Sequence, residues 1–227
     1  MSNIIISLDG NIGSGKSTFI DILKKERPQY HILDEPVANW ENTVDLDGMN
    51  LLQKFYKDQT RWGYTFQNYA YITRLKALKE AMKDGPRIII SERSIFTDKN
   101  IFAKMLFEDN RISKMEWDIY NFWFDNFKID LNGIIYINTP PDICKERINQ
   151  RSRIGEDNIP DAYLERLHNK HMDVFHDKNN VLELDGNTKF KTDKNIQDEM
   201  LLKVDNFINV SIKKQWDGLN TYMEYLC

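Results

Sequence analysis

Cysteine and long apolar runs are both scarce in this chain. Its 227 residues include two cysteines, Cys144 and Cys227, which lie far apart and exclude a disulfide framework, as is usual in a reducing compartment. The longest apolar runs, at residues 88–90 and 134–137, are far too short to span a bilayer. No basic targeting segment precedes Ile4, so we expect a cytoplasmic protein with no membrane partner.

Positive charge is not in excess either. The chain has 31 basic and 35 acidic residues and a net charge of −4, whereas proteins that wrap duplex DNA usually carry an excess of lysine and arginine. We therefore expect no nucleic-acid partner. Apolar residues make up 41% of the chain and aromatic residues 12%, which is enough to fill a core and excludes a disordered chain.

Short apolar runs alternate along the chain with longer amphipathic segments. The runs are rich in β-branched and aliphatic residues, and they predict buried parallel strands at 4–8, 31–33, 87–91, 133–138 and 181–184. The segments between them predict helices at 16–25, 49–56, 59–82, 98–108, 113–128, 141–149 and 160–177. This alternation predicts an α/β fold with a five-stranded parallel sheet and helices on both faces. We expect one domain over residues 1–210 and an extension of unknown role over 211–227.

The helix predicted at 113–128 is apolar around nearly its whole circumference. Its large apolar side chains are Trp117, Ile119, Tyr120, Phe122, Trp123, Phe124 and Phe127. Such a helix must be covered on every side. It is either a central core helix or a helix that faces the sheet on one side and a second subunit on the other, and the pattern alone leaves both alternatives open.

A phosphate-binding motif follows the first predicted strand. Residues 10–17, GNIGSGKS, match G-x-x-x-x-G-K-[ST] at every fixed position and open a predicted helix. The glycines let successive backbone N–H groups point inward around an anion, and the helix N-terminus adds partial positive charge. Lys16 is placed to reach the β- and γ-phosphates, and Ser17 to hold Mg²⁺. The sequence therefore predicts an ATP site formed by Gly10, Asn11, Ile12, Gly13, Ser14, Gly15, Lys16, Ser17 and Thr18.

Charged residues end the next two predicted strands. Glu92 and Arg93 follow the third strand, at the edge where open α/β sheets bind their ligands, and this pairing suits Mg²⁺ binding and phosphoryl transfer. Glu35 follows the second strand, and Pro36 restricts the turn that carries it. A carboxylate in this position can accept the proton of an attacking hydroxyl. The base-reading motif N-K-x-D of GTPases is absent from the chain.

Five motifs in the same order resemble those of the deoxyribonucleoside kinase family. They are the strand followed by GNIGSGKST, then EPVANW, RWGYTFQNYA, ISERSIFTD, and RSR shortly before Ile-Pro. Within this family the chain resembles the deoxycytidine and deoxyguanosine kinases, from residue 4 to about 184. The resemblance implies a P-loop kinase fold and transfer of the γ-phosphate of ATP, with Mg²⁺, to the 5′-hydroxyl of a deoxyribonucleoside. It also implies a homodimer in which the helices at 113–128 meet across a two-fold axis.

The resemblance assigns a role to each matched residue. Glu35 is the base on the 5′-hydroxyl, Arg93 contacts the 5′ end, and Ser17 and Glu92 serve the Mg²⁺ site. The nucleoside site comprises Tyr56 and Glu156 at the 3′-hydroxyl, Gln67 at the base edge, Trp40 and Phe102 at the base faces, and Arg74 and Asp98 at the far end. An arginine-rich lid at about 150–158 covers ATP, with Arg151 and Arg153 on the phosphates and Arg147 against the adenine.

Two other functions compete with this interpretation. A nucleoside monophosphate kinase, such as a thymidylate kinase, takes an acceptor that already carries a phosphate, which Glu35 would repel. A nucleotide-binding regulator would bind ATP without consuming an acceptor. Within the favoured interpretation, the ion pair expected between Arg74 and Asp98 occupies the space of a thymine methyl group, so we expect deoxycytidine, deoxyadenosine or deoxyguanosine to be preferred to thymidine.

The histidines of the last predicted helix invite a metal-binding interpretation. His168 and His171 share a helix face, but no cysteine or carboxylate completes a recognised zinc pattern with them. We predict that they are exposed helix residues, and that Cys144 is a small buried hydrophobic residue.

Overall fold

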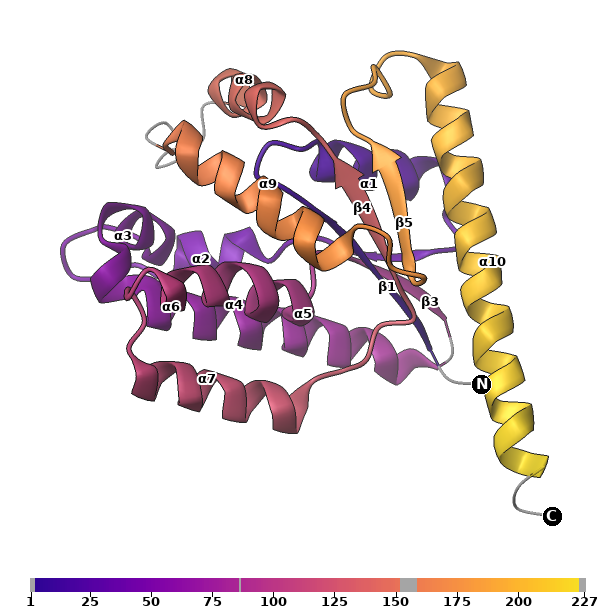
Figure 1. Ribbon diagram of the computed structural model, residues 1–227, viewed down its shortest axis with the longest axis horizontal. Helices are drawn as coiled ribbons and strands as arrows, with labels where there is room; N and C mark the ends of the chain where they lie inside the picture. Colours follow the sequence, from indigo (N-terminus) through magenta and orange to yellow (C-terminus); the bar gives the residue numbers. More distant parts are fainter. Residues whose placement is uncertain (1–2, 86, 152–158, 225–227) are drawn as a thin grey trace.

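Five parallel strands form the centre of the computed structural model, which describes residues 3–85, 87–151 and 159–224 (Figure 1). They are β1 (Ile4–Gly10), β2 (His31–Leu33), β3 (Ile88–Glu92), β4 (Gly133–Asn138) and β5 (Val181–Asp185). Their order in the sheet is β2-β3-β1-β4-β5, and every neighbouring pair is parallel. The predicted five-stranded parallel sheet is confirmed.

Helices cover both faces of the sheet, because alternate residues of each strand point to opposite sides (Figure 1). Ile6 and Leu8 pack on one side against α1 (Lys16–Glu26) and α10 (Lys194–Glu224). Ile5 packs on the other side against α4 (Gln59–Ala81). The remaining helices are α2 (Val37–Asn42), α3 (Leu51–Lys57), η1 (Met82–Asp84), α5 (Ile95–Thr97), α6 (Lys104–Glu108), α7 (Lys114–Phe127), α8 (Pro141–Arg151) and α9 (Asp161–Phe175).

Three helical segments differ from the sequence prediction. α2 and α10 were not predicted, and α10 continues without a break across residue 211, where a tail was expected to begin. Met200, Leu201, Val204 and Ile208 recur at helical spacing and pack on the sheet, which explains why this segment is a helix. The helix predicted at 98–108 is instead a π-helical turn, η2 (Asp98–Ala103), followed by α6.

α7 buries only one of its faces. Tyr120 and Phe124 pack against Tyr71 and Leu75 of α4. Other large apolar side chains of α7 are exposed, with Met115, Ile119 and Phe122 away from α4 and Trp123 and Phe127 nearer to it. Of the two alternatives left open by the sequence, a central core helix does not fit these exposed side chains, and the alternative of a second subunit stays a prediction. None of the described helices is both long enough and apolar enough to cross a membrane.

Candidate active site

The loop between β1 and α1 is tightly wound. Gly13 and Gly15 have φ angles of 78° and 99°, which residues with a side chain rarely adopt. A Cβ atom at Gly13 would lie 2.4 Å from the backbone oxygen of Cys144, so there is no room for a side chain. α1 begins directly after the loop, and its N-terminus adds partial positive charge there. This geometry suits a bound phosphate.

Lys16 lies buried inside this loop. Its Nζ atom donates to the backbone oxygen of Asn11 at 2.6 Å and to that of Gly10 at 3.1 Å. Burial, reinforced by the positive charge of Arg93, lowers the pKa of Lys16 to about 7. A triphosphate in the loop would favour the charged ammonium form, because a nearby anion stabilises a cation.

Ser17 and Glu92 come together from α1 and the end of β3. The Ser17 hydroxyl donates to the Glu92 carboxylate at 2.8 Å. One hydroxyl and one carboxylate match the way Mg²⁺ binds at nucleotide sites, where phosphates and waters complete an octahedron of oxygen atoms. In the described part of the chain, no group of three histidine, cysteine, aspartate or glutamate side chains forms an alternative metal site.

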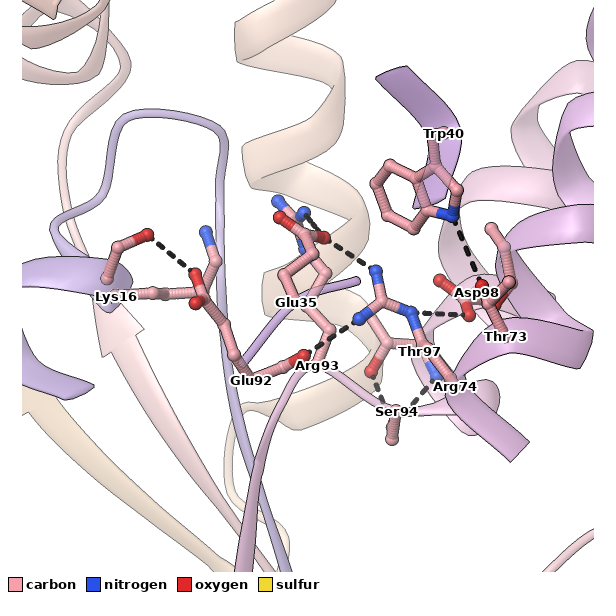
Figure 2. Close-up of polar contacts among 12 residues, drawn as sticks. Lys16, Glu35, Trp40, Thr73, Arg74, Glu92, Arg93, Ser94, Thr97 and Asp98 are labelled. Carbon is pink, nitrogen blue, oxygen red and sulfur yellow. Dashed lines mark hydrogen bonds and ion pairs between the residues drawn. The ribbon is translucent and has the colours of Figure 1, made fainter. Parts of the chain in front are cut away.

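Glu35 is held by two arginines. Its Oε1 atom accepts hydrogen bonds from Arg93 Nη1 and from Arg74 Nη2, both at 2.6 Å (Figure 2). Burial would raise the pKa of Glu35, but the charges of Arg93, Arg74 and Lys16 outweigh it and hold that pKa well below its usual value. Arg93 adopts a φ angle of 60°, a strained conformation for a residue with a side chain that is typical of functional sites.

Arg74 connects three acidic residues. Besides its bond to Glu35, it donates from Nε to Asp98 at 2.9 Å and from Nη1 to the backbone oxygen of Glu92 at 2.8 Å (Figure 2). Burial raises the pKa of Asp98 to about 6 against the opposing charge of Arg74, so the carboxylate is charged near pH 7. The ion pair expected between Arg74 and Asp98 is present, and it also reaches Glu35, which the sequence did not indicate.

A cavity of about 560 Å³ contains these groups. It extends from the phosphate loop to Gln67, and its lining includes Trp40, Tyr56 and Phe102. Gln67 is 2% exposed, and its Oε1 atom has no hydrogen-bond partner among the described residues. A buried amide oxygen without a partner costs free energy unless a ligand satisfies it, and the contact of Gln67 with the edge of a base stays a prediction.

The predicted lid is only partly within the described residues. Arg153 and Glu156 lie outside them, whereas the exposed Arg151 lines the cavity. Arg147 donates from Nη1 to the backbone oxygen of Ser14 at 3.1 Å and from Nη2 to that of Gly186 at 2.9 Å. Arg147 therefore ties the phosphate loop to the segment after β5, and its contact with adenine stays a prediction.

Several cavity residues were missed by reasoning from the sequence. On the nucleoside side they are Leu52, Phe66, Ala70 and Tyr163, and on the ATP side Gln150, Thr188, Phe190 and Lys191. Phe190 packs so closely over the phosphate loop that a Cβ atom at Gly15 would lie 2.9 Å from its ring. Its position soon after the fifth strand, at the ligand-binding edge of the sheet, was the signal that could have indicated it.

The buried residues of α8 and α9 confirm one prediction and correct another. Cys144 is fully buried, as expected. His171 is fully buried instead of exposed, and burial lowers its pKa to about 3, so the ring is neutral. It stacks on Tyr136, with ring centroids 5.9 Å apart, and shares Nδ1 in a hydrogen bond with the backbone oxygen of Leu167. His171 is therefore a core residue.

Comparison with known proteins agrees with this geometry. A family model for deoxynucleoside kinases matches residues 6–209. The chain is 41% identical over 214 residues to the probable deoxycytidine kinase of fowlpox virus (90% of this chain, 88% of the relative). It is 35% identical over 238 aligned positions to deoxycytidine kinase 1 of Xenopus laevis (90% of this chain, 90% of the relative). It is also 35% identical over 187 residues to the mitochondrial deoxyguanosine kinase of Xenopus laevis (73% of this chain, 71% of the relative). With a family model that matches most of its length, this chain belongs to the deoxynucleoside kinase family.

Proposed function

We propose that this chain transfers the γ-phosphate of ATP to the 5′-hydroxyl of deoxycytidine, deoxyadenosine and deoxyguanosine, with thymidine the poorest acceptor. One observation carries this proposal: a single cavity joins the phosphate loop to the buried amide of Gln67. Glu35 lies between the loop residue Lys16 and the base-site residues Trp40 and Asp98 (Figure 2). A donor and an acceptor bound at the two ends would meet at Glu35.

The residues around Glu35 suit transfer to a neutral hydroxyl. Glu35 orients the 5′-hydroxyl and accepts its proton, while Lys16 and the loop amides hold the β- and γ-phosphates. Mg²⁺, held by Ser17 and Glu92, neutralises charge on the phosphate oxygens when it is bound. Arg93 Nε has no hydrogen-bond partner among the described residues, so this guanidinium has a donor left for a phosphate oxygen.

A change in the contacts of Arg93 would tune Glu35 during the reaction. In the structure, the Arg93 charge is the strongest of those that keep the pKa of Glu35 low, and a carboxylate with a low pKa is a weak base. If the Arg93 guanidinium turned toward the γ-phosphate, the Glu35 carboxylate would lose part of this stabilisation and its pKa would rise. Glu35 would then accept a proton when ATP is in place, which couples the two substrates.

The base pocket supports the choice of acceptor. Trp40 and Phe102 offer aromatic surfaces, and Gln67 offers a donor and an acceptor in one plane. The ion pair of Arg74 and Asp98 lines the cavity where we expect a thymine methyl group to point, and an apolar methyl gains nothing from contact with a buried ion pair. The similarity to deoxycytidine kinases and to a deoxyguanosine kinase supports the same choice.

A nucleoside monophosphate kinase is less favoured by this site. Its acceptor phosphate would need arginines that are not already neutralised. Arg74 is bound to both Glu35 and Asp98, and Glu35 adds a negative charge where the acceptor phosphate would lie. The negative charges of Glu35 and of an acceptor phosphate would repel each other strongly in a buried site.

A coupled assay that follows ADP formation tests the proposal. The four deoxynucleosides and thymidine monophosphate are compared as acceptors, with ATP and Mg²⁺ present. We expect turnover with deoxycytidine and both purine deoxynucleosides, and little with the monophosphate. Lys16→Met should abolish turnover, whereas Lys25→Met, at a lysine whose side chain is 82% exposed, should not. Highest turnover with the monophosphate, or ATP binding without any turnover, would contradict the proposal.

We also propose a cytoplasmic homodimer of a kinase domain that ends near residue 210. The family model ends at residue 209, and the buried thiol of Cys144 suits a reducing compartment. The exposed apolar face of α7, with Phe122 at 62% exposure, supports pairing with a second copy across a two-fold axis.

Light scattering tests the homodimer. At micromolar concentration it should give about twice the chain mass of 27.0 kDa. Phe122→Glu should give a monomer, and Lys203→Glu, an equally drastic change at an exposed position of α10, should leave the dimer intact. A wild-type monomer with full activity would contradict the proposal.

A further inference from the structure

We propose that Thr73 is a positioning residue for the nucleoside site, because its hydroxyl group fixes the indole ring of Trp40. This inference rests on the proposed function, in which Trp40 forms one wall of the base pocket. Neither the sequence motifs nor the comparisons assign a role to Thr73, which lies on α4 and does not itself line the cavity.

The hydrogen bond between the two side chains is buried and directional. Trp40 Nε1 donates to Thr73 Oγ1 at 3.1 Å (Figure 2). Trp40 is 4% exposed and Thr73 9% exposed, so water does not compete readily for the indole N–H group. An indole N–H that loses its acceptor in such a place is left unsatisfied, which is costly.

The Thr73 hydroxyl is oriented by α4 itself. The Thr73 hydroxyl donates its hydrogen to the backbone oxygen of Tyr69, 2.7 Å away and one turn earlier in the helix. The backbone oxygen of Ala70, 3.0 Å away, is a second acceptor for the same hydrogen. Hydroxyl groups in helices commonly bond back to the preceding turn in this way. Since the hydrogen is committed to the helix, the lone pairs point outward, where they accept the indole N–H of Trp40.

The element that carries Trp40 is held by apolar packing against α3 and α4 and by few side-chain hydrogen bonds. α2 is only 6 residues long, follows the 3-residue edge strand β2, and has no side-chain hydrogen bond at its N-terminus. At its C-terminal end, the Thr43 hydroxyl donates to the Tyr69 hydroxyl at 3.2 Å. Tyr69 and Thr73 are one turn apart, so α4 holds α2 through two neighbouring side chains.

Two consecutive residues of α4 therefore hold the two functional residues of one segment. Thr73 binds Trp40, and Arg74 binds Glu35. The indole also packs in a T-shaped arrangement with Phe66, with ring centroids 5.2 Å apart, and the Arg74 guanidinium lies 5.3 Å from its centroid. These contacts are less directional than a hydrogen bond, and the bond to Thr73 is the one side-chain hydrogen bond of Trp40 among the described residues. Removing the Thr73 hydroxyl should thus release the base wall while the Arg74 contact keeps Glu35 in place.

This separation predicts a particular kinetic pattern. Thr73→Val has nearly the shape of threonine but no acceptor, and we expect it to raise the KM for deoxycytidine roughly fivefold to tenfold. We expect kcat to stay within about twofold of wild type and the KM for ATP to stay unchanged. Thr73→Ser, which keeps the hydroxyl, should restore the wild-type KM. Thr73→Ala provides a second variant without an acceptor if the valine variant folds poorly.

A double-mutant cycle with Trp40→Phe makes the test specific. Phenylalanine has no N–H group to anchor, so Thr73→Val should add no further increase in KM on the Trp40→Phe background. An equal increase on both backgrounds, or a Thr73→Val variant with an unchanged KM, would overturn the role of Thr73. A Trp40→Ala variant with the wild-type KM would overturn the assignment of Trp40 itself, and a wild-type chain without activity on deoxycytidine would overturn the proposed function instead.

Discussion

Replacing Glu35 by glutamine tests the centre of the proposed mechanism. Glutamine has nearly the same shape and keeps an oxygen that can accept from Arg74 and Arg93, whose donors lie 2.6 Å from the carboxylate. It removes the negative charge and the ability to take up a proton. The variant therefore separates proton acceptance from the simple filling of space.

The structure gives two magnitudes for this substitution. A positioned general base contributes roughly 10²- to 10⁴-fold to a rate, so we expect kcat to fall by about a hundredfold or more, with a smaller change in the KM for deoxycytidine. Loss of the charge also removes the one carboxylate that forms a salt bridge with the buried Arg93 among the described residues, while Arg74 keeps Asp98. Breaking a buried pair costs about 3–5 kcal/mol, and the retained oxygen atom favours the lower end of that range. For a chain of this size, a loss of about 3 kcal/mol lowers Tm by roughly 6–12 °C.

The assay must distinguish lost chemistry from lost folding. Steady-state rates at 25 °C are compared with thermal unfolding curves of the same samples, and Glu41→Gln, an exposed change on the neighbouring helix α2, serves as the matched control. We expect the control to match wild type in both measurements. A folded Glu35→Gln variant whose kcat stays within about threefold of wild type would exclude Glu35 as the base.

Two further predictions concern the pair of Arg74 and Asp98. The double change Arg74→Met with Asp98→Ala removes a buried ion pair and opens space for a methyl group. The ratio of kcat/KM for thymidine to kcat/KM for deoxycytidine should therefore rise at least tenfold. An unchanged ratio in competition assays would contradict the steric argument. Burial raises the pKa of Asp98 to about 6, so its negative charge is present above pH 6 and is lost as the pH falls below that value. The KM for deoxycytidine should therefore rise as the pH is lowered from 7 to 5 in the wild type. In Asp98→Asn, the KM should not change over this range.

The sheet and the phosphate loop were predictable because their signals are local. Each strand is a short run of apolar residues, which is what a strand covered on both faces requires, and the motif at residues 10–17 specifies its own loop and helix start. The direction of parallel strands then brings Glu35, Glu92 and the phosphate loop to one edge of the sheet. The kinase function could be predicted from the residues at that edge, because the carboxyl ends of all five parallel strands lie there.

The partners of side chains were not predictable in the same way. The sequence indicated that Arg74 and Asp98 lie near the base, but the contact of Arg74 with Glu35 spans 39 positions and depends on the packing of α4 against α2. The hydrogen bond of Trp40 to Thr73 depends on the same packing and has no motif of its own. α10 was missed for a related reason: its apolar residues stand among many charged ones, and only the sheet beneath them shows which face is buried.

α7 shows why an apolar pattern can predict burial without predicting what provides it. Hydrophobicity reports that exclusion of water is favourable, and it does not report whether the covering surface belongs to the same chain. In the structure, α4 covers the side of α7 that carries Tyr120, while Ile119 and Phe122 lie on a face that no described residue covers. The two alternatives left open by the sequence therefore differ only in which surface meets this face. Because the chain itself supplies one covering surface and leaves Ile119 and Phe122 exposed, pairing with a second copy stays a proposal, which the light-scattering experiment tests.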